Sequence, residues 1–501
     1  MRKKRLAKNA VASLMNYFIV LICSFLLPRF ILKYFGSEVN GVVISIGQFL
    51  GIISFLELGM GSVVPAALYK PLSDRDNESI SRILHSASKF YRRIAYILIA
   101  YIAVLIVLYP RLIQGNHDPL YLATLIIAIG INSFGQYYFG IVDRLLLSAD
   151  QHGYIFANIQ SVTLILNTII SIVLILLGAS IHVVKYASAL VFLIRPLCLR
   201  AYVNRHYQID RHILYSGEPI QQKWNGVAQH VAAFVLDGTD NIVLTVFTPI
   251  VNVSVYSAYH LVLNGITCVL SALTSGTGSL MGELWAKKEM QALRNLFGWY
   301  EWCIHSASTF AFSCAAVLIV PFVIVYTKGV QDANYNQPIF SAVILGAYWL
   351  RSVYLPYILM ILAAGHYKQT QYYFIIAAVI NMVLSVLLVH QIGLVGVAIG
   401  TLAAMLFQTA WMAWYNSKNL VEWEIASFLK QVAVDLLSAF LIIFFGRFFS
   451  MSAVNYFSWI VMALKVSVVA GVIELAVNFV FYRDRLAKLK SAMISRLSGN
   501  R

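Results

Sequence analysis

Long apolar segments dominate this chain and restrict the folds that it can adopt. A transmembrane helix needs about 20 mostly apolar residues, and about fourteen segments meet this requirement. They are 9–32, 41–68, 93–109, 120–147, 154–178, 180–204, 224–247, 253–281, 300–327, 338–363, 370–390, 393–416, 428–449 and 457–482. With 60% hydrophobic and 12% charged residues, the chain cannot cover itself with polar groups as a soluble domain does. We therefore predict an all-α polytopic membrane protein.

The distribution of basic residues predicts the orientation of these helices. An even number of spans places both chain ends on one side of the membrane. Lys and Arg number 37, against 21 Asp and Glu, and most of them lie on the side of the chain ends. The opposite loops hold only Lys33, Arg111 and Lys328. Because basic loops stay inside, we expect a multi-pass protein of the inner (plasma) membrane with both termini cytoplasmic.

The same distribution explains the net charge of +16. A basic excess confined to one side of a membrane protein faces anionic lipid headgroups. Membrane lipids are therefore the expected partners of these residues, and nucleic acid is excluded as a partner. The basic start of the chain, Met1 to Arg5, resembles that of a signal peptide, but the apolar run that follows is too long for one. We expect an uncleaved first span.

Motifs for catalysis or cofactor binding are missing from the sequence. The five cysteines lie in apolar runs without a CxxC pair, so we expect small buried side chains rather than a disulfide or a metal site. The sequence contains no Gly-rich phosphate loop, HExxH motif or Ser-His-Asp set. We therefore expect no enzyme activity, no cofactor and no metal, and no direct use of ATP.

Short matches between the two halves of the chain indicate an internal repeat. Gly59-Met60-Gly61-Ser62 and Gly276-Thr277-Gly278-Ser279 each end an apolar segment and precede a basic amphipathic one. Upstream of them, FGSEVN at 35–40 corresponds to FTPIVN at 247–252. A period of about 210 residues fits two six-helix lobes, and repeated bundles of this kind are typical of alternating-access transporters.

The repeat divides the chain into four predicted parts. These are an N-lobe of spans one to six at 1–207, a C-lobe of spans seven to twelve at 223–418, an appended helix pair at 425–482 and a basic cytoplasmic tail at 483–501.

Four segments resemble those of a known transporter family. They are LPRFILKYFG at 27–36, FLELGMGS at 55–62, TDNIVL at 239–244 and VYSAY at 255–259. They are similar to the corresponding parts of Wzx-type polysaccharide flippases, in the multidrug/oligosaccharidyl-lipid/polysaccharide exporter superfamily, which also contains MATE drug exporters and lipid II flippases. The resemblance covers essentially the whole chain and implies a MATE-like fold.

The resemblance also implies a substrate. Wzx-type flippases move undecaprenyl-diphosphate-linked oligosaccharide repeat units from the inner to the outer leaflet, for capsule, O-antigen or exopolysaccharide assembly. Polysaccharide polymerase and chain-length machinery are the partners that follow. Physically, the diphosphate needs cations, because an anionic group cannot enter hydrocarbon unpaired. The sugars need hydrogen-bonding groups and aromatic faces, and the lipid tail stays in the bilayer.

Basic residues inside the apolar segments are candidates for binding the diphosphate, since charges inside spans are costly. Arg351 lies near the middle of span ten, close to Tyr348 and Tyr354, which suit a first sugar. The alternative is an arginine that pairs with a carboxylate for packing. Arg29 near the outer end of span one and Arg195 in the inner half of span six are further candidates, although both can also extend to the headgroups.

Acidic and amide side chains complete the candidate set. Asp237 and Asp240 share one face of span seven, and two carboxylates in a low dielectric readily hold a proton, as ion coupling requires. The alternative is that they neutralise a basic residue. Glu57, near Gly59, is a candidate gate or helix cap. Asn132, Gln136 and Tyr137 form a possible sugar-contacting stripe on span four, or hydrogen-bond to other helices.

Three classes of function remain to be compared. The leading hypothesis is a flippase for lipid-linked oligosaccharides that works by alternating access, coupled to an ion gradient. The alternatives are a MATE-type cation-coupled exporter or a peptidoglycan-precursor (lipid II) flippase. A membrane enzyme such as a sugar polymerase is disfavoured, because such enzymes carry a large outer loop and every outer loop here is short.

Overall fold

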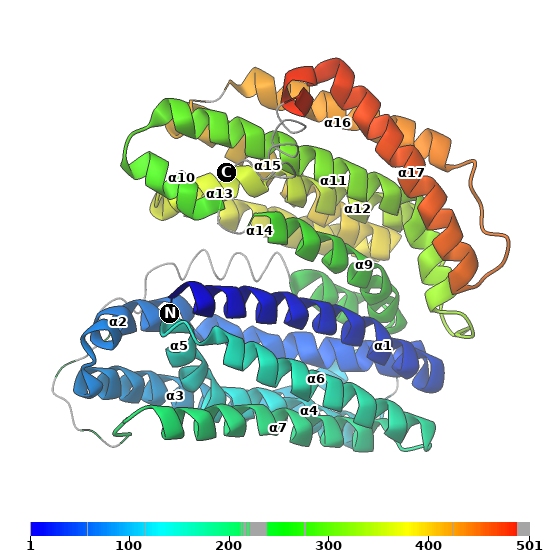
Figure 1. Ribbon diagram of the computed structural model, residues 1–501. Coiled ribbons are helices and arrows are strands. Elements are labelled where there is room, and N and C mark those ends of the chain that lie inside the picture. Colours follow the sequence, from blue (N-terminus) through cyan, green and yellow to red (C-terminus); the bar gives the residue numbers. More distant parts are fainter. Residues whose placement is uncertain are drawn as a thin grey trace. The chain divides into compact units, whose positions relative to one another are not determined.

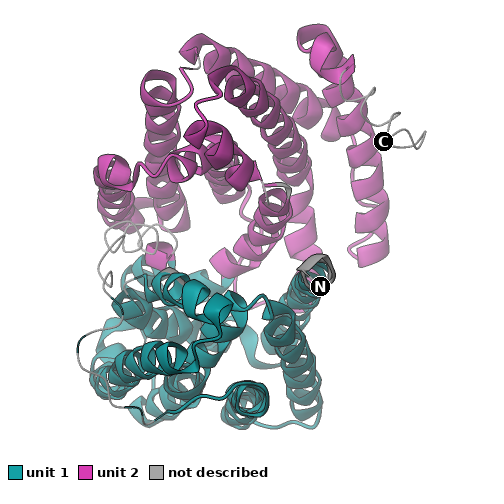
Figure 2. Cartoon of the chain, turned by 60° about the vertical axis from the view of Figure 1, so that its left-hand side comes forward, with its two compact units in different colours: residues 1–234, 241–254 teal, residues 235–240, 255–501 magenta. Residues whose placement is uncertain are grey.

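The computed structural model describes residues 2–57, 59–115, 117–211, 213, 217, 220, 238–274, 277–422 and 424–487. Helices account for all the regular structure in these ranges, apart from one isolated bridge between Gln114 and Pro249. Figure 1 shows these helices, most of them long. The chain forms two compact units, coloured separately in Figure 2. Unit 1 comprises Met1–Phe234 and Asn241–Ser254, and unit 2 comprises Val235–Asp240 and Val255–Arg501.

The helices of unit 1 follow the expected apolar segments. They are α1 (Arg2–Gly51), the 3₁₀ helix Ile52–Glu57, α2 (Met60–Asp74), α3 (Asn77–Leu112), α4 (Pro119–Gly135), the π-helical turn Gln136–Gly140, α5 (Ile141–Ala149), α6 (Gly153–Leu176) and α7 (Ile181–His206). Side-chain caps begin several of them. Asp76 accepts a hydrogen bond from the Ser79 N–H at the start of α3, and Asp118 accepts one from the Leu120 N–H at the start of α4.

The helices of unit 2 repeat this order and add a final pair. They are α9 (Val251–Leu273), which begins at the end of unit 1, α10 (Thr277–Ala286), α11 (Met290–Tyr326), α12 (Pro338–Val353), α13 (Leu355–Ala363), α14 (Tyr367–Ile392), α15 (Leu394–Asn419), α16 (Ile425–Gly446) and α17 (Tyr456–Phe481). The series α2 to α7 thus corresponds to α10 to α15. For example, α3 has 36 residues and α11 has 37, and α5 and α13 have nine residues each.

The connections between the helices repeat as well. Four residues of unit 1 with a positive φ have a counterpart in unit 2 at a separation of 213 to 215 residues: Arg75 and Lys288, Gly115 and Gly329, Gln151 and Gly365, and Gly178 and Gly393. Neighbouring helices correspond too, because α4 packs on α7 as α12 packs on α15, and α2 on α5 as α10 on α13. The two units therefore share one helix order and one set of turns.

Twelve helices in the described ranges are long and apolar enough to cross a membrane. The predicted all-α polytopic architecture is confirmed, and the difference from about fourteen spans has two causes. Gly36 (φ 82°, ψ 175°) interrupts α1, so this 50-residue helix contains the expected segments 9–32 and part of 41–68. The expected segment 224–247 lies outside the described residues up to position 237.

The surface of the helices suits a lipid solvent. Large apolar side chains are exposed along their length, including Leu177 and Phe457 at 77% and Phe448 at 73%. Buried positions are occupied by both apolar and polar residues, such as Ser171, Thr245 and Asn381. This pattern is the reverse of a soluble protein and agrees with a multi-pass membrane protein, because hydrocarbon does not drive apolar side chains inward.

Helices α14 and α15 make the closest backbone contact that we find in unit 2. Gly396 and Gly400 stand four residues apart on α15 and face α14. A Cβ atom at Gly400 would lie 2.8 Å from the Ser385 nitrogen and 2.9 Å from the Asn381 carbonyl oxygen, and one at Gly396 would lie 2.5 Å from the Leu388 carbonyl. This GxxxG pair therefore lets two backbones touch, as small residues do in membrane bundles.

We predict that Gly400→Ala lowers the stability of the protein by about 1–3 kcal/mol, because the added methyl group meets backbone atoms that cannot move aside. Thermal melting of the purified protein in detergent measures the effect. Gly471→Ala in α17 is the matched control, since a Cβ there meets nothing within 4 Å. An equal loss of stability in both variants would contradict the close packing of α14 and α15.

Candidate functional site

Two equivalent membrane-spanning helices are interrupted in the middle. In unit 1, α4 passes through the π-helical turn Gln136–Gly140 before α5. In unit 2, α12 ends at Val353 and α13 begins at Leu355, with Tyr354 between them. Interruptions at corresponding positions of two repeats are the strongest pointer to a binding site in a transporter, because they expose backbone groups inside the membrane.

Each interruption has a local cause in the sequence. Pro356 has no N–H for the Ser352 carbonyl, so the helix cannot continue through Tyr354. In unit 1 the π-helical turn ends at Gly140, where a Cβ atom would lie 3.0 Å from Cβ of Pro196 on α7. The two interruptions therefore arise from proline, once in the interrupted helix and once in its neighbour.

The unit 1 candidates Glu57 and Tyr137 are brought together by this turn. The Tyr137 hydroxyl donates a hydrogen bond of 2.7 Å to Oε1 of Glu57, which ends the 3₁₀ helix after α1. Gln136 donates to Asn132 Oδ1 at 3.2 Å, one helical turn earlier. The stripe thus contains a hydrogen-bonded amide pair and a tyrosine anchored on a carboxylate. The Glu57 bond fastens the segment before α2 to the interrupted helix.

Arg195 lies beside the same turn with a second arginine. Gln136, Gly140, Arg144, Arg195 and Pro196 line a cavity of about 20 Å³, which is enough for one water molecule. The two guanidinium groups lie over aromatic rings, Arg195 at 5.6 Å from the Phe192 centroid and Arg144 at 5.4 Å from the Phe156 centroid. None of the ion pairs found within the described ranges includes either arginine.

In unit 2, Asp240 belongs to a buried hydrogen-bond network. Its Oδ2 accepts hydrogen bonds from the Tyr256 hydroxyl and the Thr401 hydroxyl, both at 2.8 Å. Thr401 in turn accepts a bond of 3.0 Å from the Asn381 amide. Asp240 and Asn381 are 3% and 0% exposed. This network ties several helical segments around one carboxylate.

Arg351 and Tyr348 lie close to this network. The Arg351 guanidinium is 5.8 Å from the Tyr348 ring centroid, and the Tyr348 ring meets the His260 ring edge-on at 5.7 Å. His260 also stacks with Tyr256, the donor to Asp240, at 5.5 Å. Arg351 lies in the last turn of α12, where the helix dipole favours a cation. The candidates Arg351, Tyr348 and Asp240 thus belong to one neighbourhood, with Tyr354 at its edge.

Two predicted candidates stand apart from these groups. Arg29 lies in α1 of unit 1, directly after Pro28, and is half-buried. Asp237 lies outside the described residues, so the structure places only Asp240 of the expected carboxylate pair.

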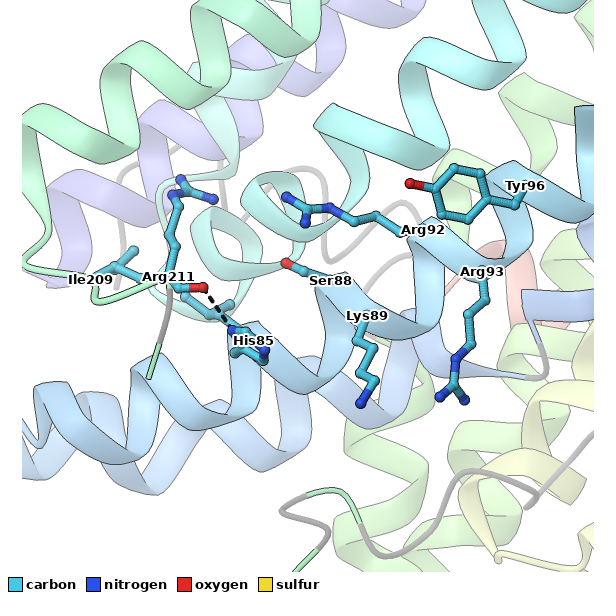
Figure 3. A pocket seen from close by; sticks show the side chains of 9 residues that line it. His85, Ser88, Lys89, Arg92, Arg93, Tyr96, Ile209 and Arg211 are labelled. Atoms are coloured by element: carbon cyan, nitrogen blue, oxygen red, sulfur yellow. Dashed lines mark hydrogen bonds between the residues drawn. The ribbon is translucent and has the colours of Figure 1, made fainter. Parts of the chain in front are cut away.

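A cation-lined pocket in unit 1 was not among the candidates from the sequence. It has a volume of about 300 Å³ and is formed by the first part of α3 and the segment after α7. The charged and polar residues that line it are His85, Ser88, Lys89, Arg92, Arg93 and Arg211. In Figure 3, Arg92 and Arg211 extend toward one another, while Lys89 and Arg93 extend together from the other side of α3.

Hydrogen bonds fasten the segment after α7 to α3 and so shape the pocket. The Asp210 N–H donates to Ser81 Oγ at 3.0 Å. His85 Nδ1 lies 2.7 Å from the Arg211 carbonyl oxygen, which can only accept a hydrogen bond. The Arg211 side chain donates to Asp143 at 3.1 Å and to Asn204 at 2.9 Å.

The charge of the pocket is strongly positive. Asp143, 2% exposed, offsets the charge of Arg211 and does not itself line the pocket. Lys89, Arg92 and Arg93 are exposed and take part in none of the ion pairs found in the described part of the chain. Arg92 lies over the Tyr138 ring at 5.2 Å. An anion with several oxygens is the ligand that such a group of donors can bind.

Sequence reasoning missed the pocket for a physical reason. It identified Lys89 and Arg92 only as part of the polar face of an amphipathic helix. Arg211 joins them through contacts between residues more than a hundred positions apart, which no local pattern reveals.

No family model matches the chain, and no curated protein matches its sequence. Solved structures do match it. Lipid II flippase MurJ in an inward closed conformation gives a TM-score of 0.72 at 14% identity, covering 95% of this chain and 100% of that one. An inward-facing MATE-family multidrug resistance transporter of the MOP superfamily gives 0.61 at 15%, covering 82% and 98%. The MATE multidrug transporter DinF-BH gives 0.55 at 13%, covering 84% and 97%.

The chain has the fold of these transporters. At such low identities the likeness concerns the fold, and the expected MATE-like architecture is confirmed. All three of these structures are transporters, and each match covers almost the whole of the matched chain.

We predict that Thr401→Val destabilises the protein by about 1–3 kcal/mol, because Asn381 and Asp240 each lose a buried hydrogen-bond partner while the side-chain volume stays the same. Thr401→Ser keeps the hydroxyl and is the control. Thermal melting in detergent compares the two variants. A Val variant as stable as the wild type would show that the network around Asp240 does not stabilise unit 2.

Proposed function

We propose that this protein is a flippase that moves undecaprenyl-diphosphate-linked oligosaccharide repeat units from the inner to the outer leaflet, for polysaccharide biosynthesis. Transport proceeds by alternating access and is coupled to an ion gradient. The observation that carries this proposal is the cation-lined pocket of unit 1, in a chain with the fold of MurJ and MATE transporters.

The pocket supports an anionic cargo over a cationic one. Lys89, Arg92, Arg93 and Arg211 supply donors suited to phosphate oxygens, and no carboxylate is among the described residues of the lining. A drug cation would be repelled from these residues. The volume of about 300 Å³ lies at the lower end of the range for small-molecule sites, which fits a headgroup rather than a whole lipid.

The residues around the helix interruptions suit the rest of the headgroup. Arg351 with Tyr348 in unit 2, and Asn132 with Gln136 in unit 1, offer a cation, an aromatic face and amide groups. Arg144 and Arg195 form a second pair of cations beside the unit 1 turn. We propose these residues, with Arg29 and Tyr354, as the cavity contacts of the moving substrate, and Glu57 with Tyr137 as a gate.

A lipid II flippase is the alternative that a specific observation favours. The MurJ structure covers 95% of this chain, whereas the two MATE structures cover 82% and 84%. Both cargoes carry a diphosphate, so the pocket does not separate them. The resemblance of four sequence segments to Wzx-type flippases favours the oligosaccharide substrate. On this proposal the protein lies in the inner membrane with both termini in the cytoplasm, beside polysaccharide polymerase and chain-length machinery.

Deletion of the gene tests the proposed cargo. We expect loss of surface polysaccharide and accumulation of lipid-linked repeat units on the cytoplasmic face, measured by lipid extraction and by labelling of accessible sugars. Normal polysaccharide with altered drug resistance would instead favour a MATE-type exporter. Normal polysaccharide with accumulated peptidoglycan precursors would favour a lipid II flippase.

The role of the pocket is tested with Lys89→Gln/Arg92→Gln in the deletion strain. We expect export to fall at least about tenfold, because two charge-assisted contacts to phosphate are lost. Arg82→Gln is the matched control, since Arg82 lies on the same helix, pairs with Glu78 and does not line the pocket. Equal export by the double variant and the control, at equal protein levels, would remove the pocket from the mechanism.

A further inference from the structure

A group of buried ionisable residues lies in unit 2, apart from the residues considered so far. It is formed by α11, α13, α16 and α17, and it joins the final helix pair to the rest of the unit. Its ionisable members are Glu301, His305, Asp435 and Glu474. The apolar contact between the same helices, which includes Cys314, Ile442 and Val466, lies further along them.

A histidine and an aspartate form the centre of this acid cluster. His305 Nδ1 is 2.6 Å from Asp435 Oδ2, and the two side chains are 0% and 2% exposed. Gln431 donates to the other oxygen of Asp435 at 3.2 Å. With Nδ1 carrying the hydrogen, Nε2 presents a lone pair, and within the described residues this buried nitrogen makes no hydrogen bond. The pair is thus arranged to accept one more proton at Nε2.

Two further carboxylic acids stand beside this pair on neutral donors. Glu301 accepts a hydrogen bond from the Tyr357 hydroxyl and is close enough for its charge to act on His305. Glu474 accepts a bond of 2.9 Å from the Asn478 amide, while Asn478 Oδ1 accepts one of 2.6 Å from the Trp302 indole. The charge of Asp435 acts in turn on Glu474. Oε2 of Glu474 is buried and makes no hydrogen bond in the described part of the structure.

Counting charges shows why this cluster must hold protons. Three carboxylates face a single imidazole, so full ionisation would leave two uncompensated negative charges even with a cationic His305. Each uncompensated charge in a buried site costs several kcal/mol, and a surrounding bilayer increases this cost. The electrically balanced state has one His305–Asp435 pair and two protonated glutamic acids.

The other titratable groups nearby indicate how a proton reaches the cluster. The charges of Asp435, Glu301 and Arg485 all act on Tyr482, which follows α17. Lys430 of α16 lies 5.3 Å from the Tyr482 ring centroid, and the charge of Arg485 also acts on Cys303 of α11. Glu474 is seven residues from the end of α17, or about 10 Å. The cluster therefore lies within reach of the membrane surface at that end.

The opposite side of the cluster is closed by aromatic rings. Phe428 of α16 meets the His305 ring edge-on at 6.2 Å and the Tyr357 ring edge-on at 5.6 Å. Tyr357 also meets Phe297 at 5.5 Å. These rings exclude water around the His305–Asp435 pair, which keeps the local dielectric low and the cost of an unbalanced charge high.

We propose that Glu301, His305, Asp435 and Glu474 form the proton-binding site through which this transporter is coupled to the proton gradient. The site takes protons, and its protonation changes the charge balance between α11 and the α16–α17 pair. The coupling role rests on the proposed transport function, whereas proton binding by the cluster does not. Asp240 then has a structural role in its network with Tyr256 and Thr401.

Infrared difference spectroscopy on the purified full-length protein tests the proton binding. At neutral pH we expect the carbonyl band of protonated carboxylic acids, which disappears as the pH is raised. Glu474→Gln and Glu301→Gln should each remove about half of this band, since the charge balance assigns one proton to each glutamate. Asp484→Asn, at an exposed position beyond α17, is the matched control and should leave the band unchanged.

The wild-type spectrum decides the matter even if a variant fails to fold. The absence of a protonated carboxyl band at neutral pH would overturn the proposal. So would a band that persists in full in both glutamine variants but is lost in Asp240→Asn. Replacing choline with sodium distinguishes the ions, because loss of the band on adding sodium would assign a sodium site instead.

Polysaccharide export in cells tests the coupling separately. With a proton-coupled flippase, Glu474→Gln should lower export and make the remaining export insensitive to a protonophore, whereas Asp484→Asn behaves as wild type. Protonophore-sensitive export by Glu474→Gln would overturn the coupling role. Normal polysaccharide in the deletion strain would refute the proposed cargo while leaving the spectroscopic result intact.

Discussion

A polar group that faces hydrocarbon has no solvent to satisfy it, and this constraint explains most of the structure. Backbone groups are satisfied within helices, so the chain contains almost no other regular structure in its described ranges. Where a span is interrupted, at Gln136–Gly140 and at Tyr354, polar side chains gather around the break. Where side chains carry charge inside the bundle, they are held by several donors, as Asp240 and Asp435 are.

The sequence predicted the helical architecture because apolar length is a local property. It also predicted a repeat of about 210 residues, close to the 213 to 215 that separate corresponding turns such as Arg75 and Lys288. What it could not predict was the division of α1, since Gly36 interrupts the helix without a proline. The interruption at Tyr354 was readable in principle, because Pro356 follows it by two residues.

The candidate residues were predicted less completely, because function depends on contacts that are distant in sequence. Glu57 and Tyr137 are 80 residues apart and share a hydrogen bond, although each was selected for a different role. His305 and Asp435 are 130 residues apart, and each is an isolated ionisable residue in a long apolar segment. Such a signal marks a residue as costly, yet it does not reveal a partner. The pocket of unit 1 was hidden for the same reason, because Arg211 reaches α3 from beyond α7.

The correspondence between α3 and α11 has a consequence for how the two halves divide their work. At a separation of about 214 residues, the basic stretch of α3 from His85 to Arg93 corresponds to the stretch of α11 that contains Glu301 and His305. One copy of an ancestral helix has become a docking surface for anions, and the other has become a store of hydrogen ions. Duplication thus gave this protein two equivalent positions of opposite polarity, so that cargo and driving ion need not compete for the same residues.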